Sequence, residues 1–444
     1  MNPDIFKAYD VRGIFGKDFS TEDAETIAYA IVSTLKLKTI ALGRDARPSS
    51  PEIFEAIARG LMKAGANIID LGLLTTPMVY FASWKLDVDA ALSVTASHNP
   101  PEWNGLKIAK RGAIPVGGEN GLFDIRDAAI SRSFSDAAIP GTRSTHDIQP
   151  EYFDHFASFA AFGSRKFRIV IDCANAMGIL ELPIFRRFPK NIELITLYDD
   201  LNHPFTAHEA NPLKTETLDE LREHVIEEHA DFGISFDGDA DRIGFVDETG
   251  EILPMDHMTG LLARDVLKTH PGATILYDLR SSKAVKEIIE EAGGIAKECK
   301  VGHANIKRQM RDDHAIFAGE LSGHYYFKEN SYAEAGSLAA LRLMNLVAET
   351  GKTVSELAKD LKRYFHSGEI NSEVADKDAV LQSLEKTYGD GIISHLDGLK
   401  VEYPNWWFNV RPSNTEPVLR LNMEADTPDL LKEKREEILA IIRA

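Results

Sequence analysis

Cysteine is nearly absent from this 444-residue sequence, which contains only Cys173 and Cys299. One lies on an apolar stretch and the other in a charged run, so the sequence predicts neither a disulfide framework nor a cysteine metal site. No apolar run reaches about eighteen residues, and the first residues lack the basic and apolar segments of a secretion signal. These absences favour a protein of the reducing cytoplasm with no membrane partner.

Positive charge is also in deficit. The chain has 50 Lys and Arg against 69 Asp and Glu, a formal net charge of −19. This balance disfavours nucleic acid and anionic lipid as partners, and an anionic substrate would need local cationic pockets. The chain is 44% hydrophobic, as expected of a globular protein, and its length predicts about three or four domains.

Helix and strand patterns alternate from the start of the chain. Ser20 is predicted to cap a helix, and the apolar segment 39–42 that follows has the character of a buried strand. Ser50 is then predicted to cap, and Pro51 to open, a second helix before a strand over 67–71. This βαβ order indicates a mostly parallel sheet.

The same pattern recurs further along. Apolar strands at 168–172 and 273–278 each end in an acidic residue and a polar turn, as residues 43–47 do in the first unit. After about residue 366 the chain instead shows strand patterns followed by one helix. We therefore predict three topologically similar α/β domains with mostly parallel mixed sheets, plus a smaller C-terminal α+β domain. The predicted domains are residues 1–140, 141–250, 251–365 and 366–444.

A serine stands in a polar turn, Thr95–Pro100, directly behind the apolar segment 90–94. We expect Ser97 to be exposed and held still in this turn. An ordinary loop is the alternative, because Ser, Asn and Pro are common turn residues.

Three carboxylates lie downstream, at Asp237, Asp239 and Asp241. On an extended backbone, residues two apart point to the same side, so we expect the three side chains to converge. Such a set would leave room for a phosphate oxygen or water in the shell of Mg²⁺. A solvated acidic turn is the alternative, which mutual repulsion of the carboxylates disfavours.

An EF-hand calcium loop is a further alternative, because Glu248 falls at its twelfth position. Two features oppose it: Arg242 stands where that loop requires glycine, and the segment 243–246 has the pattern of a strand.

A cluster of phosphate-type donors occurs near the C-terminus. Its guanidinium, hydroxyl and backbone N–H groups can converge on one phosphate, although a hairpin turn with an incidental arginine is the alternative. The cluster comprises Arg411, Ser413, Asn414 and Thr415. A nucleophilic hydroxyl, a metal loop and an anion-binding cluster together indicate phosphoryl transfer.

A third polar turn follows the apolar segment 315–318. Glu320, Ser322 and His324 offer a carboxylate, a hydroxyl and an imidazole within five residues, which suits a polyhydroxylated ligand. Taken alone, a polar turn after a strand is commonplace.

Other residues are ambiguous one at a time. Tyr9, Arg12 and Lys107 are most simply surface groups, and His98 and His303 are most simply hydrogen-bonding turn residues.

Together these segments resemble the α-D-phosphohexomutase superfamily, and within it the bacterial phosphomannomutase/phosphoglucomutase group. The resemblance spans nearly the whole chain and keeps the family's motif order. The motifs are Tyr9–Gly13, Gly43–Arg47, Thr95–Pro100, Asn104–Lys107, Asp237–Arg242, Lys300–His303, Gly319–His324 and Arg411–Pro417. It implies that the predicted domains surround a central cleft.

The resemblance also implies roles for the matching residues. Ser97 would be the phosphorylated serine, and its phosphate would hold Mg²⁺ together with Asp237, Asp239 and Asp241. The other residues assigned to catalysis are Arg12, His98, Lys107, Arg242 and, for proton transfer, His303. Those assigned to the sugar phosphate are Tyr9, Arg280, Glu320, Ser322 and His324, with Arg411, Ser413, Asn414 and Thr415 on the phosphate that is not reacting.

The implied activity interconverts hexose 6-phosphate and hexose 1-phosphate, of mannose and also of glucose, through a hexose 1,6-bisphosphate intermediate that also serves as activator. Phosphoglucosamine mutases typically carry glycine where this chain has Asn414, and the segment 367–371 looks more like that of phosphomannomutases. One departure is the segment Ala333–Gly336, where many relatives place an aspartate before the glycine. Phosphoglucosamine mutase, a phosphatase and a non-catalytic sugar-phosphate-binding protein are the alternatives. We expect sugar phosphates as the partners and a monomer or weak homo-oligomer.

Overall fold

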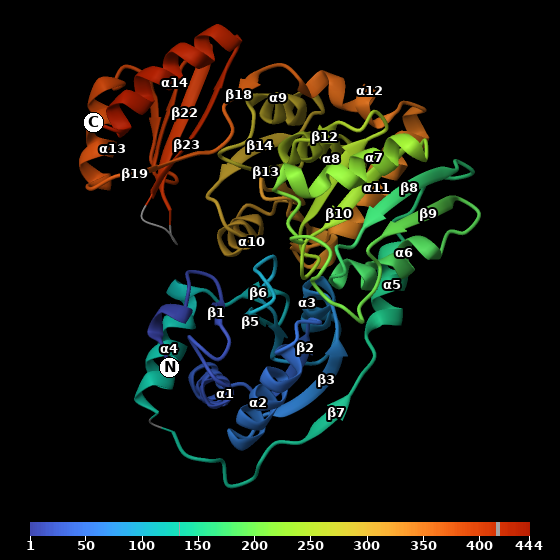
Figure 1. Cartoon of the computed structure of the whole chain (residues 1–444), viewed down its shortest axis with the longest axis vertical. Coiled ribbons are helices and arrows are strands. Elements are labelled where there is room, and N and C mark those ends of the chain that lie inside the picture. The colour runs from blue at the N-terminus through green and yellow to red at the C-terminus, as the bar shows by residue number, and fades with distance from the viewer. Residues whose placement is uncertain (133, 414–417) are drawn as a thin grey trace.

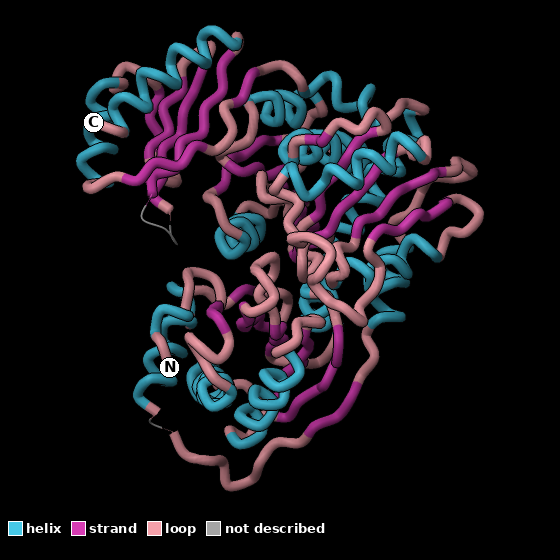
Figure 2. Tube along the Cα trace, viewed as in Figure 1, coloured by secondary structure: helices cyan, strands magenta, loops and turns pink. Residues whose placement is uncertain are grey.

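The computed structural model describes residues 1–132, 134–413 and 418–444. Figure 1 shows four units, from the blue N-terminal unit through green and yellow units to a red C-terminal one, and Figure 2 shows strands gathered into sheets that helices flank. The predicted α/β fold class is confirmed. No helix in this part of the chain has both the length and the apolar character needed to cross a membrane.

The first unit begins as the sequence predicts. Ser20 and Asp23 form a reciprocal capping box that opens α1 (Thr21–Leu35). The further helices are α2 (Ser50–Lys63), α3 (Thr76–Lys85) and α4 (Leu122–Ser131). In sheet order the strands are β1 (Val11–Ile14), β5 (Trp103–Lys110), β4 (Ala90–Val94), β2 (Thr39–Arg44), β3 (Asn67–Leu73) and β7 (Arg143–Thr145), with β6 (Ile114–Pro115) against β5.

The predicted cap of α2 is wrong. Ser50 is the first residue of the helix, and its hydroxyl donates to the Asp45 carboxylate instead of accepting from the helix N-terminus. Ser49 precedes the helix and forms no side-chain cap. The Ser50 hydroxyl bonds Asp45 because the Asp45 carboxylate lies close by, directly after the end of β2.

The second and third units repeat one sheet order. The second has β12 (Ile252–Leu253), β11 (Ile243–Asp247), β10 (Phe232–Phe236), β8 (Phe167–Asp172) and β9 (Ile192–Leu197). The third has β17 (Ala333–Glu334), β16 (Tyr325–Phe327), β15 (Phe317–Gly319), β13 (Thr274–Asp278) and β14 (Ile295–Cys299). Their helices are α5 (Gln149–Ala157), α6 (Leu182–Arg186), α7 (Asp219–Glu227), α8 (Met255–Thr269), α9 (Lys283–Glu291), α10 (His303–Asp312), α11 (Gly336–Thr350) and α12 (Val354–Ala358).

A common core of strands relates these three units. In each, a central strand (β2, β8 or β13) pairs in parallel with two neighbouring strands. One of these neighbours, the inner parallel strand (β4, β10 or β15), then pairs antiparallel with a further strand (β5, β11 or β16). An aspartate at the end of each central strand accepts a hydrogen bond from the backbone N–H two residues on, at 2.9–3.0 Å. These aspartates are Asp45, Asp172 and Asp278. The repeated acidic turn seen in the sequence is therefore a repeated structural element.

The last unit is built differently. All its strand pairs are antiparallel, in the order β18 (Phe365–His366), β23 (Val418–Ala425), β22 (Trp406–Pro412), β21 (Leu399–Glu402) and β20 (Ile392–Ser394), with β19 (Ile370–Glu373) also on β23. Its helices are α13 (Lys377–Thr387) and α14 (Pro428–Ile442). One buried apolar cluster runs through the first three units, whereas this unit encloses a cluster of its own around Phe408.

Candidate active site

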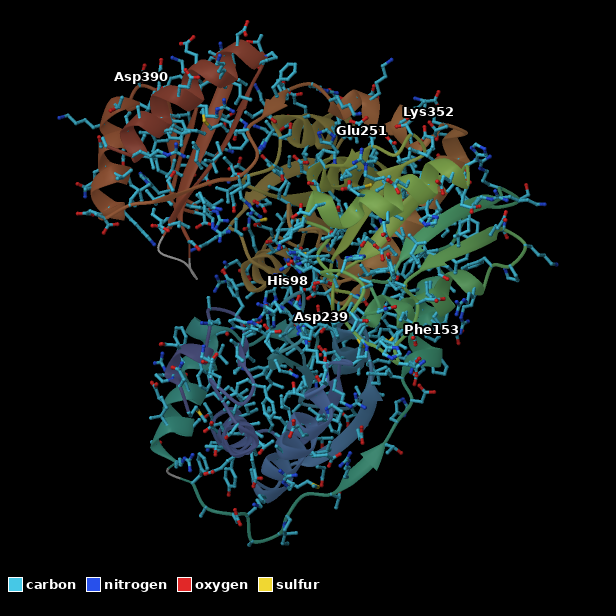
Figure 3. All side chains as sticks on the ribbon, viewed as in Figure 1. His98, Phe153, Asp239, Glu251, Lys352 and Asp390 are labelled. Carbon is cyan, nitrogen blue, oxygen red and sulfur yellow. The ribbon has the colours of Figure 1, made fainter. Side chains whose placement is uncertain are left out.

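Three polar loops meet at the centre of the molecule. Each loop follows the inner parallel strand of its unit and leads into the antiparallel neighbour: β4 to β5, β10 to β11, and β15 to β16. The loops therefore occupy the same position in three repeated units. Figure 3 labels His98 and Asp239, from the first two loops, near the middle of the molecule where the blue and green units meet.

The serine loop is held from beneath by a buried arginine. Arg47 donates to the carbonyl oxygens of Ser97 and Pro100, both at 2.6 Å, and of Asn99 at 2.7 Å. The Ser97 N–H donates to the Thr95 hydroxyl at 2.9 Å, and Ser97 itself is left-handed with φ 53°. Arg47 was part of a predicted motif, but its hydrogen bonds to the carbonyls of this loop were not predicted.

The expectation of an exposed serine is wrong. Ser97 is 1% exposed because the acidic loop packs directly on it. A Cβ atom on Gly238 would lie 2.1 Å from the Ser97 carbonyl oxygen, so only glycine permits this approach. The Ser97 hydroxyl donates to Asp237 Oδ2 at 2.8 Å and lies 3.3 Å from His98 Nδ1. The serine is thus held still, but by a second unit of the fold.

The acidic loop brings its three carboxylates together, although not on an extended backbone. The Ala240 N–H donates to the Asp237 carbonyl at 3.1 Å, and Ala240 has φ 63°, so the segment is a tight turn. One oxygen from each of Asp237, Asp239 and Asp241 lies within 4.8 Å of the others, and all three residues are buried. The predicted convergence is confirmed and the predicted geometry is wrong.

The donor set fits a hard divalent cation. Lys107 Nζ lies 2.7 Å from Asp239 Oδ2 and 2.5 Å from Asp241 Oδ2, and Thr76 donates to the same Asp239 oxygen at 2.6 Å. The other oxygen, Asp239 Oδ1, is buried without a hydrogen-bond partner among the described residues. Burial, with Asp241 and Asp239 alongside, raises the pKa of Asp237. A cation bound by carboxylate oxygens would satisfy the unpaired atom and relieve this repulsion.

The EF-hand alternative is not supported. The segment after the acidic loop is strand β11, and Glu248 accepts hydrogen bonds from the backbone and hydroxyl of Ser355 at the start of α12.

Further predicted cations and a histidine surround Ser97. Arg12 donates to the Asn99 side chain at 2.7 Å and pairs with Asp10. The Arg242 N–H donates to Asp237 Oδ1 at 3.1 Å, and its Nε lies 4.0 Å from Asp237 Oδ2. Burial, then the charges of Arg242 and Arg12, lowers the pKa of His98 well below its usual range, so His98 is neutral at pH 7.

The third loop joins the second through a histidine. His324 Nε2 lies 3.3 Å from Asp241 Oδ1, while Nδ1 lies 2.7 Å from the Ser322 hydroxyl and 3.1 Å from Glu320 Oε2. Burial opposes protonation, but Asp241 and Glu320 raise the pKa of His324 to about 9. The three residues predicted from one polar turn therefore form a single hydrogen-bonded group.

His303 opens α10 beside a buried ion pair that was not predicted. Its Nδ1 lies 3.6 Å from Glu334 Oε1, and Glu334 Oε2 lies 2.5 Å from Lys307 Nζ. The Tyr9 ring packs against His303 at a centroid distance of 5.4 Å. Burial, then Lys307 and Lys107, lowers the pKa of His303 well below its usual range. The segment that contains Glu334 was noted in the sequence as a departure, but neither the role of Glu334 nor its pairing with Lys307 was predicted.

An arginine cluster links the third and fourth units. Arg411 Nη2 donates to Glu369 Oε2 at 3.2 Å, Arg280 Nη1 lies 3.6 Å from the same oxygen, and Arg420 Nη1 donates to Glu369 Oε1 at 3.0 Å. Arg280 Nη2 also lies 4.0 Å from Glu320 Oε1, which connects the cluster to the third loop. Ser413 is buried one residue beyond β22, and the predicted contacts of Asn414 and Thr415 lie outside the described residues.

Repeated α/β units, a buried serine against an acidic triad, and an arginine cluster define a phosphoryl-transfer enzyme of the phosphohexomutase class. Four segments match phosphoglucomutase/phosphomannomutase family descriptions: alpha/beta/alpha domains I (residues 3–133), II (150–250) and III (254–364), and the C-terminal domain (369–441). The chain belongs to this phosphoglucomutase/phosphomannomutase family, as its resemblance predicted.

Relatives match over almost the full length. The phosphomannomutase of Methanocaldococcus jannaschii is 39% identical, with 99% of this chain and 97% of that protein covered. The phosphomannomutase of Escherichia coli K12 is 36% identical, with 98% of each covered. A solved family protein from Burkholderia thailandensis superposes with a TM-score of 0.92 at 30% identity, covering 100% of this chain and 98% of that one.

Proposed function

We propose that this enzyme interconverts hexose 6-phosphate and hexose 1-phosphate, with mannose phosphates as main substrates and glucose phosphates as further ones. The observation that carries the proposal is the hydrogen bond from the Ser97 hydroxyl to Asp237, because it places a nucleophile against a cation-binding triad. Phosphoglucosamine mutase and a non-catalytic sugar-phosphate-binding protein are less well supported, since the relatives above are phosphomannomutases and both loops are intact.

In the proposed cycle, phosphorylated Ser97 gives its phosphoryl group to the free hydroxyl of a hexose monophosphate. The P–O bond to Ser97 breaks as the sugar oxygen forms a new one. The sugar hydroxyl proton leaves to a base, and the released Ser97 oxygen takes up a proton. The resulting hexose 1,6-bisphosphate turns over in the cleft and returns its other phosphoryl group to Ser97. Most of the rate then comes from positioning and electrostatics rather than from covalent chemistry on the protein.

Charge control at Ser97 falls to a metal and to fixed cations. Asp237, Asp239 and Asp241, with a phosphate on Ser97, would hold Mg²⁺, which supplies positive charge to the transferred phosphoryl oxygens when bound. Lys107, next to two of these carboxylates, and Arg242 add further positive charge on the same side. Arg12, which donates to the Asn99 side chain in the same loop as Ser97, supplies a further positive charge.

Proton transfer is assigned to His303, with His98 as a neutral hydrogen-bonding partner of Ser97. Because burial lowers the pKa of His303, its imidazole is neutral at pH 7 and can accept the proton of a sugar hydroxyl. His324 is held protonated and is suited instead to donating a hydrogen bond.

Substrate recognition is divided between two clusters. Glu320, Ser322 and His324 would contact the sugar hydroxyls. The phosphate that is not reacting would be held by the residues of the arginine cluster and its neighbours: Tyr9, Arg280, Arg411 and Ser413, with Asn414 and Thr415. In the structure Glu369 accepts from these arginines, so they already hold one anionic group.

We further propose that the domain limits lie near residues 140, 250 and 365; β7 and β12 extend the first and second sheets a few residues past the first two limits. We also propose that the enzyme works in the cytoplasm as a monomer or weak homo-oligomer. Both cysteines are buried free thiols, which suits a reducing compartment.

A coupled assay that compares mannose 1-phosphate, glucose 1-phosphate and glucosamine 1-phosphate tests the substrate assignment. We expect the highest kcat/KM with mannose 1-phosphate and measurable turnover of glucose 1-phosphate. Preference for glucosamine 1-phosphate would favour the phosphoglucosamine alternative, and turnover of none would favour a binding protein.

A further inference from the structure

A cavity lies beside the candidate active site, between the first and third units. Its volume is about 550 Å³, and its walls are the N-terminal segment 6–9, the segment 114–123 and helix α10 with Lys300 before it. Figure 1 shows α10 directly above β6 and β1, where these walls meet. Among the residues assigned to the reaction, Tyr9 alone lines this cavity.

The cavity gathers cations that form no ion pair within 4.0 Å in the described part of the chain, although Arg311 interacts with the charge of Glu334 and Lys300 with that of Asp397. The cations are Lys7, Lys300, Arg308 and Arg311. Arg308 donates to the Asn305 side-chain oxygen at 3.1 Å, and Arg311 donates to backbone carbonyls, including that of Gly112 at 2.6 Å. Among the described side chains of the lining, Asp312 is the acidic one. In a chain of net charge −19, four cations against one carboxylate among these described side chains form a local positive site.

The floor of the cavity is apolar and tightly built. The Phe123 ring packs over Gly118, where a Cβ atom would lie 2.6 Å from the ring, and the Gly118 N–H donates to the Ala8 carbonyl at 2.9 Å. Phe6 and Pro115 add further apolar surface. Two side-chain amides, Asn120 and Asn305, also line the cavity as neutral hydrogen-bonding groups. Convergent polar groups around an apolar floor are typical of a small-molecule site, and the volume lies within the usual range of about 300–1,000 Å³.

We propose that this cavity binds a small organic phosphate that carries two or more phosphoryl groups on an apolar or ring-shaped body. The lysines and arginines match the phosphoryl charges, and Arg308, whose guanidinium bonds the Asn305 side chain through one nitrogen, can offer paired N–H donors. Arg311 adds positive charge, while its Nη1 and Nη2 groups donate to backbone carbonyls. The rings of Phe6 and Phe123 match the body. A nucleoside diphosphate and a hexose bisphosphate share this chemistry, and the test separates them.

The site has a structural route to the active site. Tyr9 lines the cavity, its hydroxyl donates to the Val301 carbonyl at 3.3 Å, and its ring packs on His303. A ligand here would also touch both the first and third units at once. This part of the inference rests on the proposed mutase function, whereas binding itself does not.

Binding is measured by titration calorimetry with three probes: inorganic pyrophosphate, GDP and glucose 1,6-bisphosphate. The protein is the full chain with Arg411→Ala, which weakens the proposed phosphate contacts of the active site. We expect GDP or the bisphosphate to bind more tightly than pyrophosphate, because only these two carry a body for the apolar floor. Whichever binds tighter identifies the ligand class.

Two charge reversals decide the location. Lys7→Glu with Arg308→Glu should weaken binding by about tenfold or more, because each removes a charged contact and adds repulsion. Lys352→Glu, an exposed change on the far side of the molecule (Figure 3), is the matched control and should leave binding unchanged. In the chain with native Arg411, the Lys7→Glu and Arg308→Glu pair should keep its mutase turnover in the absence of probe, which shows that it folds. Binding unaffected by the reversals, or absent for all three probes at millimolar concentration, would overturn the proposal, and neither result depends on turnover.

Discussion

The Ser97 hydroxyl donates a hydrogen bond to Asp237 Oδ2 across 2.8 Å, and this contact joins the first and second repeated units. A second contact, from His324 Nε2 to Asp241 Oδ1 at 3.3 Å, joins the third unit to the same acidic loop. Equivalent turns in three copies of one sheet topology thus supply the proposed nucleophile, the proposed cation-binding carboxylates and the proposed sugar-binding group. The site is assembled where the units meet, so its geometry depends on how they pack.

Replacing Ser97 by alanine should abolish both mutase turnover and phosphorylation of the enzyme. The hydroxyl is the proposed acceptor of the phosphoryl group, and no other group replaces it. Incubation with glucose 1,6-bisphosphate followed by intact-mass measurement should show one added phosphate on the native chain and none on the variant.

Ser93→Ala is the matched control for this experiment. Ser93 is also buried, on β4 four residues before Ser97, and its hydroxyl lies 3.2 Å from that of Thr76. This variant should still take up phosphate. Phosphorylation of the Ser97→Ala chain at another residue would show that the nucleophile has been misassigned.

Two substitutions in the acidic loop and beside it should change Mg²⁺ affinity in opposite directions. Asp239→Asn removes one of three carboxylate charges, so Mg²⁺ should bind more weakly and activity should be partly recovered at high Mg²⁺. Lys107→Met removes the ammonium group that lies against Asp239 and Asp241, so Mg²⁺ should bind more tightly while turnover falls. Titration calorimetry measures the first effect and a coupled assay the second.

Chelation adds a simpler check on the same loop. EDTA should silence the native enzyme, and added Mg²⁺ should restore it. Full activity in chelator, or Mg²⁺ affinity that is the same in both variants, would contradict a metal site at these carboxylates.

The arginine cluster predicts opposite effects on KM from two neighbouring residues. Arg411→Ala should raise KM for hexose 1-phosphate and hexose 6-phosphate by about ten- to a hundredfold, since a charged hydrogen bond contributes about 1.5–3 kcal/mol. Glu369→Gln should lower KM, because the carboxylate that competes for Arg411 and Arg420 loses its charge. Steady-state kinetics in both directions measures these changes. An equal rise in KM for both variants would mean that Glu369 orients the arginines rather than competing with phosphate.

Much of the candidate site could be predicted from the sequence because its chemistry is local. The serine turn, the three aspartates and the Glu320 to His324 turn each fall within a few residues, and turn chemistry identifies them. The burial of Ser97 could not be predicted, since it comes from Gly238, far away in the chain. The same holds for Arg47, whose bonds to the Ser97 and Asn99 carbonyls cross from one strand end to another.

The pairing of side chains that lie on different helices and strands was the other feature that could not be predicted from the sequence. Lys307 lies on an ordinary amphipathic helix and Glu334 on a two-residue strand, so neither position shows that the two charges meet in the interior. Whether the two charges meet is decided by the packing of α10 against the end of the third sheet. The fold class was accessible because strand and helix periodicities are properties of short segments, whereas such pairs are properties of the assembled units.

The buried pair of Lys307 and Glu334 should be coupled in stability and should control His303. Both residues are at most 1% exposed, and the lysine also sits 4.0 Å from the centre of the Tyr80 ring. Lys307→Met or Glu334→Met alone leaves one charge buried without its partner, which typically costs about 3–5 kcal/mol. The double variant removes both charges and should lose much less than the sum of the two. Hydrogen exchange of the α10 amides gives the local free energies.

The Lys307 variant should also change the pKa of His303. Burial and then Lys307 hold the pKa of His303 down, so Lys307→Met should raise that pKa and bring imidazole protonation closer to neutral pH. NMR titration of the His303 ring measures the shift, and the acid limb of the kcat profile should move upward with it if His303 accepts the substrate proton. Additive stability losses would show that Lys307 and Glu334 are not coupled. A raised His303 pKa with an unmoved kcat profile would show that the proton goes elsewhere.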